Sequence, residues 1–204
     1  RMDLLVANKL MLYKGKNLDI ICQAEALNTF NKTRQNMDKI FYSMYVTEVV
    51  NNFGVEDDPC SNEVYDILYG ALNKISEALD IVEILLAVIK FQLKMMQISG
   101  FGIELDTCLC CGKSINDENM YFSTQMGGVV CAKCNETSKL HTVLHHKIRD
   151  FLNSELQSEF DYVSEYDKKA NEKVCLVCFE LLKEYINLHS SKKFNSTDIL
   201  QEIR

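Results

Sequence analysis

Two Cys-x-x-Cys pairs constrain this chain more than any other feature of its sequence. The first pair is Cys108 and Cys111, the second is Cys131 and Cys134, and residues 112–130 lie between them. A gap of about 15–20 residues between two such pairs is typical of a four-cysteine zinc site. Each pair can direct both sulfurs at one point from a tight turn, and four thiolates complete the tetrahedral coordination of Zn²⁺. Such a closed site leaves no position for water or substrate, so the sequence predicts one structural zinc ion.

Glycines and a fifth cysteine accompany these pairs. Gly112 follows the first pair and is predicted to take a positive φ, which other residues adopt only with strain. Gly127 and Gly128 favour a turn before the second pair. Cys110 adds a thiol inside the first pair and could exchange with either cysteine of that pair, although we expect it not to be a ligand. A redox-active dithiol or two disulfides are the alternatives to zinc.

The distribution of charge limits where a nucleic acid could bind. The 204 residues carry a formal net charge of −7, which gives no overall support for nucleic-acid binding. Residues 1–53 nevertheless hold seven basic and five acidic side chains, so phosphate contacts are expected in this part. The candidates lie on or just after a predicted hairpin: Lys9, Lys14, Lys16, Lys32 and Arg34. A solvated turn is the alternative for the three lysines of the hairpin.

Cysteine usage and hydropathy indicate the compartment. Nine cysteines are an odd number, and without a signal peptide they favour a reducing cytoplasm over secretion. The most apolar run, residues 81–98, is interrupted by five charged or amide side chains and is too polar to cross a bilayer. Because Arg1 is not an initiator methionine, we expect the sequence to begin inside a longer polypeptide.

The hydrophobic pattern predicts a short β region followed mainly by helices. Residues 3–27 alternate with period two around a turn at 13–17, which indicates a hairpin. Helical stripes follow, and a capping box of Asp80 and Glu83 begins the helix that we expect at the centre of a bundle. The predicted helices cover about 30–53, 64–75, 81–98, 139–152 and 167–189, with Ser196 capping a short terminal helix. Short strands at 121–123 and 129–130 would make the zinc segment a ribbon.

Several other residues have a structural interpretation that outweighs a chemical one. Cys175 and Cys178 repeat the pair spacing, but they lie in an amphipathic helix without a partner pair and are predicted to be core thiols. His141 and His145 could share a helix face and bind metal, yet no carboxylate is spaced to act as a general base. The acidic stretch 154–167 is typical of a solvated face. No phosphate-binding loop or hydrolase motif is present, so nothing argues for catalysis.

Three groups of residues occur in an order that points to one family. They are Leu12-Tyr13-Lys14-Gly15-Lys16-Asn17-Leu18-Asp19 with Gln23-Ala24-Glu25 and Phe30, then Gly100-Phe101 with Leu105-Asp106-Thr107-Cys108, then Tyr121-Phe122-Ser123 with Gly127-Gly128 and Cys131. With these residues the chain resembles, over most of its length, the RecO family of bacterial recombination-mediator DNA-repair proteins. Ile103 departs from the family pattern, which commonly has proline there.

The resemblance implies a mainly helical fold with an embedded zinc ribbon. Residues 1–27 would be the last strands of an OB-fold whose first half is absent from this sequence. Residues 28–99 and 137–204 would form the two parts of the helical domain, and residues 100–136 would form the ribbon.

The resemblance also implies a function without catalysis. Members of the family bind single- and double-stranded DNA, anneal complementary strands, and with RecR help RecA replace single-stranded-DNA-binding protein (SSB), whose C-terminal tail they capture. The expected place is therefore the cytoplasm, at the nucleoid, with no membrane contact and no small-molecule substrate. Two alternatives stay open: a zinc-ribbon module that binds only proteins, and a zinc hydrolase or thiol oxidoreductase. The last would require an open metal position or a cysteine of depressed pKa, and labelling of Cys175 or Cys178 at neutral pH would indicate it.

Overall fold

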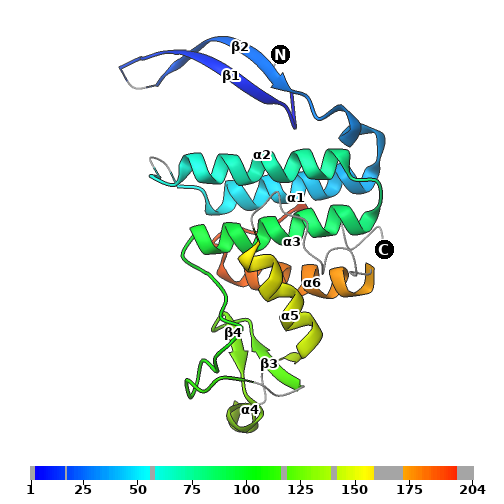
Figure 1. The fold of residues 1–204 in the computed structure, drawn as a ribbon. Coiled ribbons are helices and arrows are strands. Elements are labelled where there is room, and N and C mark those ends of the chain that lie inside the picture. Colours follow the sequence, from blue (N-terminus) through cyan, green and yellow to red (C-terminus); the bar gives the residue numbers. More distant parts are fainter. Residues whose placement is uncertain are drawn as a thin grey trace.

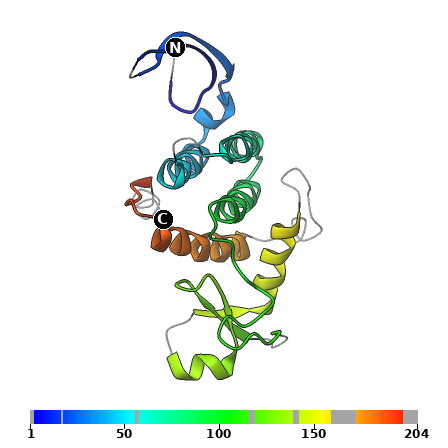
Figure 2. The same ribbon diagram turned by 90° about the vertical axis from the view of Figure 1, so that its left-hand side faces the viewer.

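The chain is arranged as a hairpin, a set of helices and a small ribbon that follow one another along the molecule (Figure 1). The computed structural model describes residues 3–16, 18–55, 58–115, 119–138, 142–158 and 172–196. Its elements in chain order are β1 (Ala7–Tyr13), β2 (Ile20–Asn28), η1 (Asn31–Gln35), α1 (Met37–Phe53), α2 (Ser61–Glu77), α3 (Ile81–Ile98), β3 (Asn119–Ser123), β4 (Gly128–Val130), α4 (Ala132–Ser138), β5 (Thr142–His145), α5 (His146–Gln157) and α6 (Glu172–His189). The mainly helical fold expected from the sequence is confirmed. Figure 2 shows the same order from the side, with the hairpin and the ribbon at opposite ends.

The predicted hairpin is present, with strands that begin later than expected. Strands β1 and β2 pair antiparallel, with Lys9 opposite Glu25 and Tyr13 opposite Ile20. Residues 3–6 precede β1, and Leu5 among them has a positive φ of 55°. Large apolar side chains remain exposed along the hairpin: Leu10, Met11, Leu12, Tyr13, Leu18, Ile20, Ile21 and Leu27. Two strands with apolar side chains exposed in this way are only marginally stable by themselves in water.

The first helix begins seven residues after the expected start at Phe30. Phe30 is buried and left-handed, with φ 43°, and the single turn η1 follows it. The side chain of Asn36 then accepts a hydrogen bond from the backbone N–H of Lys39 at 3.1 Å, which satisfies an N–H group that the first helical turn leaves without a partner. Helix α1 therefore begins at Met37 and runs beside α2.

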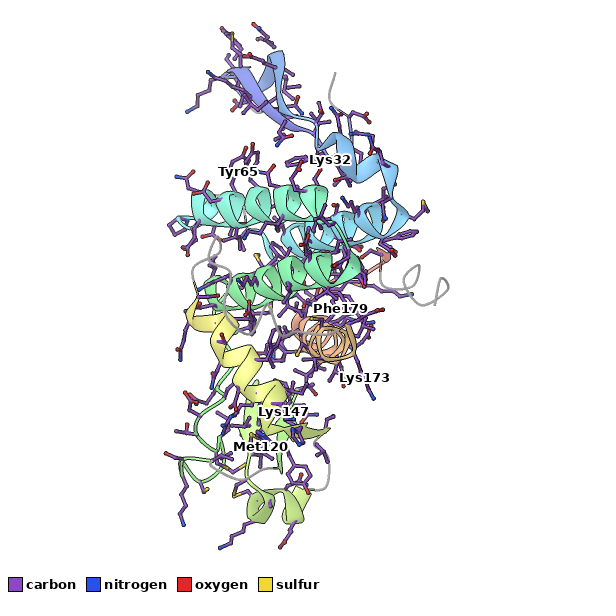
Figure 3. The ribbon with its side chains drawn as sticks, turned by 45° about the vertical axis from the view of Figure 1, so that its right-hand side comes forward. Lys32, Tyr65, Met120, Lys147, Lys173 and Phe179 are labelled. Atoms are coloured by element: carbon purple, nitrogen blue, oxygen red, sulfur yellow. The ribbon has the colours of Figure 1, made fainter. Side chains whose placement is uncertain are left out.

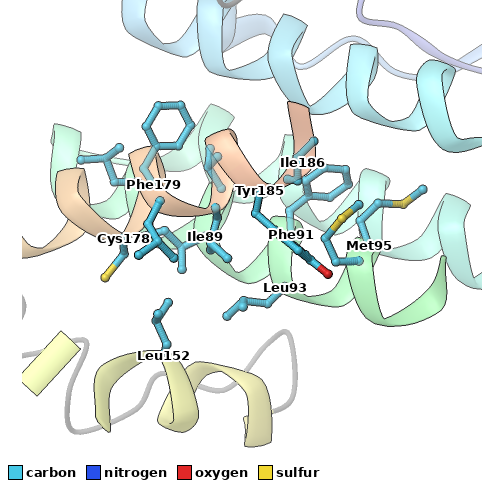
Figure 4. Close-up of a cluster of buried hydrophobic side chains, with 14 of the residues drawn as sticks. Ile89, Phe91, Leu93, Met95, Leu152, Cys178, Phe179, Tyr185 and Ile186 are labelled. Carbon is cyan, nitrogen blue, oxygen red and sulfur yellow. The ribbon is translucent and has the colours of Figure 1, made fainter. Parts of the chain in front are cut away.

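Helix α3 occupies the central position predicted for it. Asp80 accepts from the N–H of Glu83 at 2.9 Å, and Glu83 accepts in return from the N–H of Leu79 at 2.7 Å, one residue earlier than in a standard capping box. Helix α3 contacts α1, α2, α5 and α6. Figure 4 shows side chains of α3, α5 and α6 meeting in the core between these helices. None of the described helices has both the length and the apolar character needed to cross a membrane.

Polar contacts are also built into this apolar core. Gln92 Nε2 donates to the hydroxyl of Tyr45 at 2.8 Å, which joins α3 to α1. Lys90 Nζ lies 3.3 Å from a carboxylate oxygen of Glu155, which joins α3 to α5. Glu155 is fully buried, so the expectation that residues 154–167 form a solvated face is wrong at this position. The sequence shows that Glu155 is acidic, but it does not show that Lys90 on another helix forms an ion pair with it.

The chain after the ribbon differs in part from the expected helices at 139–152 and 167–189. Residues 142–145 form strand β5, which pairs with β3, and α5 begins only at His146. His145 ends the strand, and its Nδ1 accepts from the N–H of Lys147 at 3.3 Å. Helix α6 is described from Glu172 and buries Cys175 and Cys178, as predicted for core thiols. His141, residues 159–171 and the terminal helix expected after Ser196 lie outside the described residues.

Candidate metal centre

A small three-stranded sheet frames the four cysteines. Its strand order is β4-β3-β5, with Phe122 opposite Val129 and Tyr121 opposite Val143. The strands predicted at 121–123 and 129–130 are confirmed by β3 and β4. Seven apolar side chains are buried in and around this sheet: Leu105, Ile115, Met120, Phe122, Val129, Val130 and Leu144. The ribbon therefore has a small apolar core in addition to its cysteines.

The first Cys-x-x-Cys pair lies on a tight turn held by backbone hydrogen bonds. The N–H of Gly112 donates to the carbonyl of Cys108 at 2.8 Å, and the N–H of Cys108 donates to the carbonyl of Lys113 at 2.8 Å. Gly112 has a φ of 69°, which confirms the predicted need for glycine after the second cysteine. The N–H of Leu109 donates to the carbonyl of Val129 at 3.0 Å, so this turn is fixed against β4.

The second pair is positioned by the change from strand to helix. Cys131 follows β4 directly, and Cys134 lies in the first turn of α4. The N–H of Asn135 donates to the carbonyl of Cys131 at 3.0 Å, as expected at the start of a helix. A helical first turn places residues three apart on one side, so both sulfurs face the first pair.

The four sulfurs converge on one point. The Sγ atoms of Cys108, Cys111, Cys131 and Cys134 all lie within 4.8 Å of one another, and those of Cys111 and Cys131 are 4.0 Å apart. Sulfurs at the usual Zn–S distance of about 2.3 Å would be about 3.8 Å apart in a regular tetrahedron. A small contraction thus converts the observed cluster into a coordination shell, and the cluster is able to hold a metal ion. Cys110 is exposed and does not belong to this cluster.

The surroundings of the four thiols favour the deprotonated form of Cys108, which is the most buried of them. Burial alone would raise the pKa of Cys108, but backbone N–H groups of Cys131, Cys111 and Cys110 direct their hydrogens at its sulfur and lower the pKa to about 6. One of these contacts, from Cys131 N to Cys108 Sγ, measures 3.3 Å. The pKa of Cys134 is raised to about 12 mainly by its side-chain contact with Cys131. Four sulfurs this close cannot all be anionic without a cation between them, and a divalent metal ion supplies that charge.

Gly127 and Gly128 have different roles from each other. Gly127 has a φ of 73°, and a Cβ built there would lie 2.5 Å from the hydroxyl of Tyr185 on α6. At Gly128 φ is not positive, but a Cβ would lie 2.5 Å from the carbonyl oxygen of Glu104. The expected turn thus requires Gly127, whereas Gly128 is needed because the segment before the first pair passes directly against β4.

Glu104 organises the approach to the first pair, and the sequence analysis missed it. Its Oε1 accepts from the N–H of Asp106 and of Thr107, each at 2.8 Å, and these two hydrogen bonds lower the pKa of its carboxyl. Its backbone accepts from the N–H of Val129 at 2.9 Å and donates to the carbonyl of Gly127 at 3.0 Å. A signal was available in the sequence, because an acidic side chain often accepts hydrogen bonds from backbone N–H groups two and three residues later in a turn.

Three side chains fix the ribbon to the helices. Arg149 on α5 donates to the carbonyl of Ile115 at 2.8 Å, and Asn153 on the same helix donates to Asp106 at 2.8 Å. Tyr185 on α6 donates to the carbonyl of Phe101 at 3.0 Å. The four-cysteine cluster is therefore connected through its loops to the helical core.

The structure separates the five basic residues predicted to contact DNA into two groups. Lys9, Lys14 and Lys16 are exposed on the hairpin, and no carboxylate of the described residues forms an ion pair with them. Lys32 is paired with Glu77 on α2. Arg34 lies 3.3 Å from Asp3 and also donates to the carbonyls of Thr29 and Leu4.

Comparison with known proteins identifies the family. The sequence model of the family described as "Recombination protein O C terminal" matches residues 34–198, which is most of the chain. The chain belongs to the RecO family. RecO proteins are non-enzymatic recombination mediators that act in DNA repair. The matched residues include all four cysteines of the cluster.

Curated RecO proteins match the chain beyond the limits of that family model. The DNA repair protein RecO of Desulforamulus reducens is 27% identical over 196 residues, which cover 96% of this chain and 74% of the relative. RecO of Caldanaerobacter subterraneus is 27% identical over 205 residues, covering 98% of this chain and 77% of the relative. RecO of Halalkalibacterium halodurans is 26% identical over 190 residues, covering 91% and 72%. The similarity to RecO proteins thus extends into the hairpin.

Proposed function

We propose that this protein is a recombination mediator that binds and anneals DNA and, together with RecR, helps RecA load onto strands covered by SSB. The observation that carries the proposal is the family match over residues 34–198. The closed set of four cysteine sulfurs agrees with it, because four protein ligands leave no coordination position for a reacting molecule.

The proposed phosphate contacts begin at the tip of the hairpin. Lys14 and Lys16 stand at the turn between β1 and β2, both exposed, and Lys9 lies further along β1 opposite Glu25. We expect Lys14 and Lys16 to contribute most, since both are exposed at the tip of the hairpin, where the nearby carboxylate of Asp19 accepts from the N–H of Gly15 at 3.2 Å. Lys32 and Arg34 would have to exchange Glu77 and Asp3 for a phosphate, so we expect less from them.

The exposed apolar side chains of the hairpin support its proposed place in an OB-fold. Residues 1–27 would supply the last strands, and further strands of the same domain would cover the residues now exposed on β1 and β2. The proposed helical domain then comprises residues 28–99 and 137–204, with the ribbon at residues 100–136 inserted between its parts.

Zinc is the proposed metal at the four-cysteine cluster. Cys108, Cys111, Cys131 and Cys134 would hold one ion, which when bound contributes coordination bonds to the fold and no catalytic step. Soft thiolate ligands in tetrahedral arrangement select zinc or an iron–sulfur centre among common metals. Elemental analysis of the purified protein should give one zinc per chain, and iron in its place would refute the assignment.

DNA binding is tested by its salt dependence. The affinity of the full-length protein for single-stranded oligonucleotides should fall as salt rises, and Lys14→Glu with Lys16→Glu should weaken binding and flatten that slope. Removing one phosphate interaction should reduce the slope of log K against log salt by about 0.7. A full-length protein that neither binds nor anneals DNA would contradict the proposal.

A groove beside the ribbon favours a second candidate function, that of a module that binds only proteins. This cavity of about 750 Å³ lies between β5, α5 and α6 and has apolar walls that include Val143, Ile148 and Val177. It is also the candidate seat of the apolar SSB tail, whose acidic groups would compete with Glu180 for Lys183. Val177→Asp should abolish SSB binding and leave DNA binding unchanged. If DNA binding is absent while the groove still captures a protein, the second function holds.

A further inference from the structure

A second cavity lies at the other end of the molecule, between the base of the hairpin and helices α1 and α2. It measures about 220 Å³, and its walls include Val6 just before β1, Asn8 of β1, Thr47 of α1, and Tyr65, Leu68 and Tyr69 of α2. Figure 3 shows Tyr65 on the side of α2 that faces the hairpin. This cavity therefore borders the base of the hairpin that carries Lys9, Lys14 and Lys16.

One wall of the cavity is a short stack of aromatic rings. The rings of Tyr65 and Tyr69 are 5.9 Å apart and inclined by only 23°, so they stack. Phe30 contacts Tyr69 edge-on at 5.7 Å and 63°. Phe30 is buried at one end of this series, whereas Tyr65 at the other end is 48% exposed. An exposed ring that ends a stack offers a flat surface to another planar group.

Hydrogen bonds fix the inner members of the stack. Asn28 Nδ2 donates to the hydroxyl of Tyr69 at 3.3 Å and to Asn73 Oδ1 at 2.8 Å. Asn28 Oδ1 accepts from the N–H of Phe30 at 2.9 Å, which positions the ring that contacts Tyr69. Tyr69 is thus a fixed support for Tyr65, and ordering it does not add to the entropic cost of binding a ligand.

Asn8 belongs to the cavity wall, and its side chain carries a buried oxygen without a hydrogen-bond donor in the described part of the chain. Asn8 Oδ1 is buried and has no hydrogen-bond partner among the described residues, while Asn8 Nδ2 donates to the carbonyl of Val6 at 3.1 Å. A buried acceptor without a donor is unfavourable, and a purely apolar occupant would leave it so. A nucleobase has a flat face for Tyr65 and N–H groups that Asn8 Oδ1 accepts once this side chain turns towards the cavity.

We propose that this cavity binds one base of a single DNA strand, with the base stacked on Tyr65 and its N–H group donating to Asn8. The proposal rests on the DNA-binding function proposed above and names a site for it. Helix α2 carries the exposed Glu63 and Asp66 close to Tyr65 in sequence, so the phosphates of the strand would lie away from α2, on the side of the hairpin. Stacking accepts any base, as a mediator that acts on arbitrary sequence requires.

The first experiment measures oligothymidylate binding by the full-length wild-type protein, Tyr65→Ala and Tyr65→Phe. Tyr65→Ala should lose roughly 5- to 150-fold in affinity, the usual effect of removing one stacked base, and Tyr65→Phe should retain the wild-type affinity. The slope of affinity against salt should be the same in all three, because no phosphate contact is removed. A strand with abasic sugars keeps its phosphates, so the wild type and Tyr65→Ala should bind it equally.

A second experiment reports the contact directly. These 204 residues contain no tryptophan, so Tyr65→Trp introduces the single reporter among them, and its fluorescence should be quenched saturably by oligothymidylate. Val177→Trp is the matched control, since Val177 is 45% exposed but lies in the groove beside the ribbon. It should show no quenching.

The outcomes separate this site from the general function. If the wild type binds DNA but Tyr65→Ala binds with equal affinity and Tyr65→Trp is not quenched, the stacking site is wrong and the DNA-binding function stands. If Tyr65→Ala also loses affinity for the abasic strand, the residue acts on phosphates or on folding, and the stacking site is again overturned. A wild-type protein that binds no DNA overturns both.

Discussion

Lys90 and Glu155 form an ion pair inside the helical core, and their burial determines how much each residue contributes to the free energy of unfolding. The two side chains are 6% and 0% exposed. Replacing one charged partner leaves the other in an apolar surrounding, which typically costs about 3–5 kcal/mol. Glu155→Leu alone should therefore lower the free energy of unfolding by about that amount, as measured by denaturant titration. Lys90→Met with Glu155→Leu should recover most of the loss, because an apolar pair needs no compensating charge.

The exposed ion pair of Lys32 and Glu77 serves as the control for the substitutions at Lys90 and Glu155. Both of its side chains are more than half exposed, so Glu77→Gln should change the unfolding free energy by less than about 1 kcal/mol. Equal effects at the two pairs would show that burial does not decide the contribution of these ion pairs.

Glu48 on α1 holds the segment that follows α6, and this contact should depend on pH. Burial would raise the pKa of Glu48, but hydrogen bonds from Asn195 and Ser196 outweigh it and keep the pKa below the usual 4.5. A lowered pKa means that the carboxylate stabilises the fold above the pKa of the unfolded chain and that this contribution is lost as pH falls through the lowered value. Glu48→Gln should therefore speed amide exchange at Asn195 and Ser196 near neutral pH, whereas the difference from the wild type should vanish in acid.

A matched substitution checks that this effect belongs to the contact. Glu63 is exposed on α2, so Glu63→Gln should leave exchange at the Asn195 and Ser196 amides unchanged at every pH. If Glu48→Gln also leaves it unchanged near neutral pH, Glu48 does not anchor this segment.

At the scale of elements, the ribbon depends on how closely its first segment approaches β4. A Cβ at Gly128 would lie 2.5 Å from the carbonyl oxygen of Glu104 and 2.9 Å from Leu109, so Gly128→Ala must push the first cysteine pair away from the second. The variant should lose bound metal to a chelator much faster than the wild type. Gly102→Ala is the control, because its nearest neighbour is 3.8 Å away and its φ is not positive. Similar rates for the two variants would refute this account of Gly128.

The elements that the sequence predicted are those whose signal is local. Asp80 and Glu83 stand at a fixed spacing before an apolar run, so the start of α3 at Ile81 was predictable. Strand β5 was not, because four residues are too short for a reliable alternation and the pairing partner, β3, is distant in sequence. The beginning of α1 at Met37 likewise depends on the buried, left-handed Phe30, a conformation that propensity does not indicate.

The same distinction applies to the candidate sites. The four cysteines were predictable because the spacing within each pair fixes the local turn, and the structure brings all four sulfurs together. The aromatic stack of Tyr65 and Tyr69 has no such signal, because both residues simply fall within an amphipathic helix. Its proposed role depends on a hairpin that folds back over α2 from far away in the sequence, and on Asn8 within that hairpin.

For the whole molecule, the dependence of the ribbon on its four cysteines predicts a selective response to loss of metal. The buried core is continuous and includes ribbon residues such as Phe122, but the large buried side chains Tyr45, Phe91 and Phe179 lie on α1, α3 and α6 rather than in the ribbon. The ribbon has the smaller core and relies on its four sulfurs. Structural zinc in isolated small domains contributes about 10–16 kcal/mol, so its removal should unfold the ribbon first.

Hydrogen exchange measured with and without a chelator at neutral pH checks this directly. Amides of β3, β4 and the turn of the first cysteine pair, including Leu109 and Val129, should lose protection, whereas amides in the middle of α3 should keep it. Far-UV circular dichroism should retain most of its helical signal, since α4 is short and is the one helix among the described residues of the ribbon. Loss of protection throughout α3 would mean that Arg149, Asn153 and Tyr185 transmit the unfolding, so that the ribbon and the helices form one cooperative unit. Full protection in the ribbon after metal removal would contradict a structural metal.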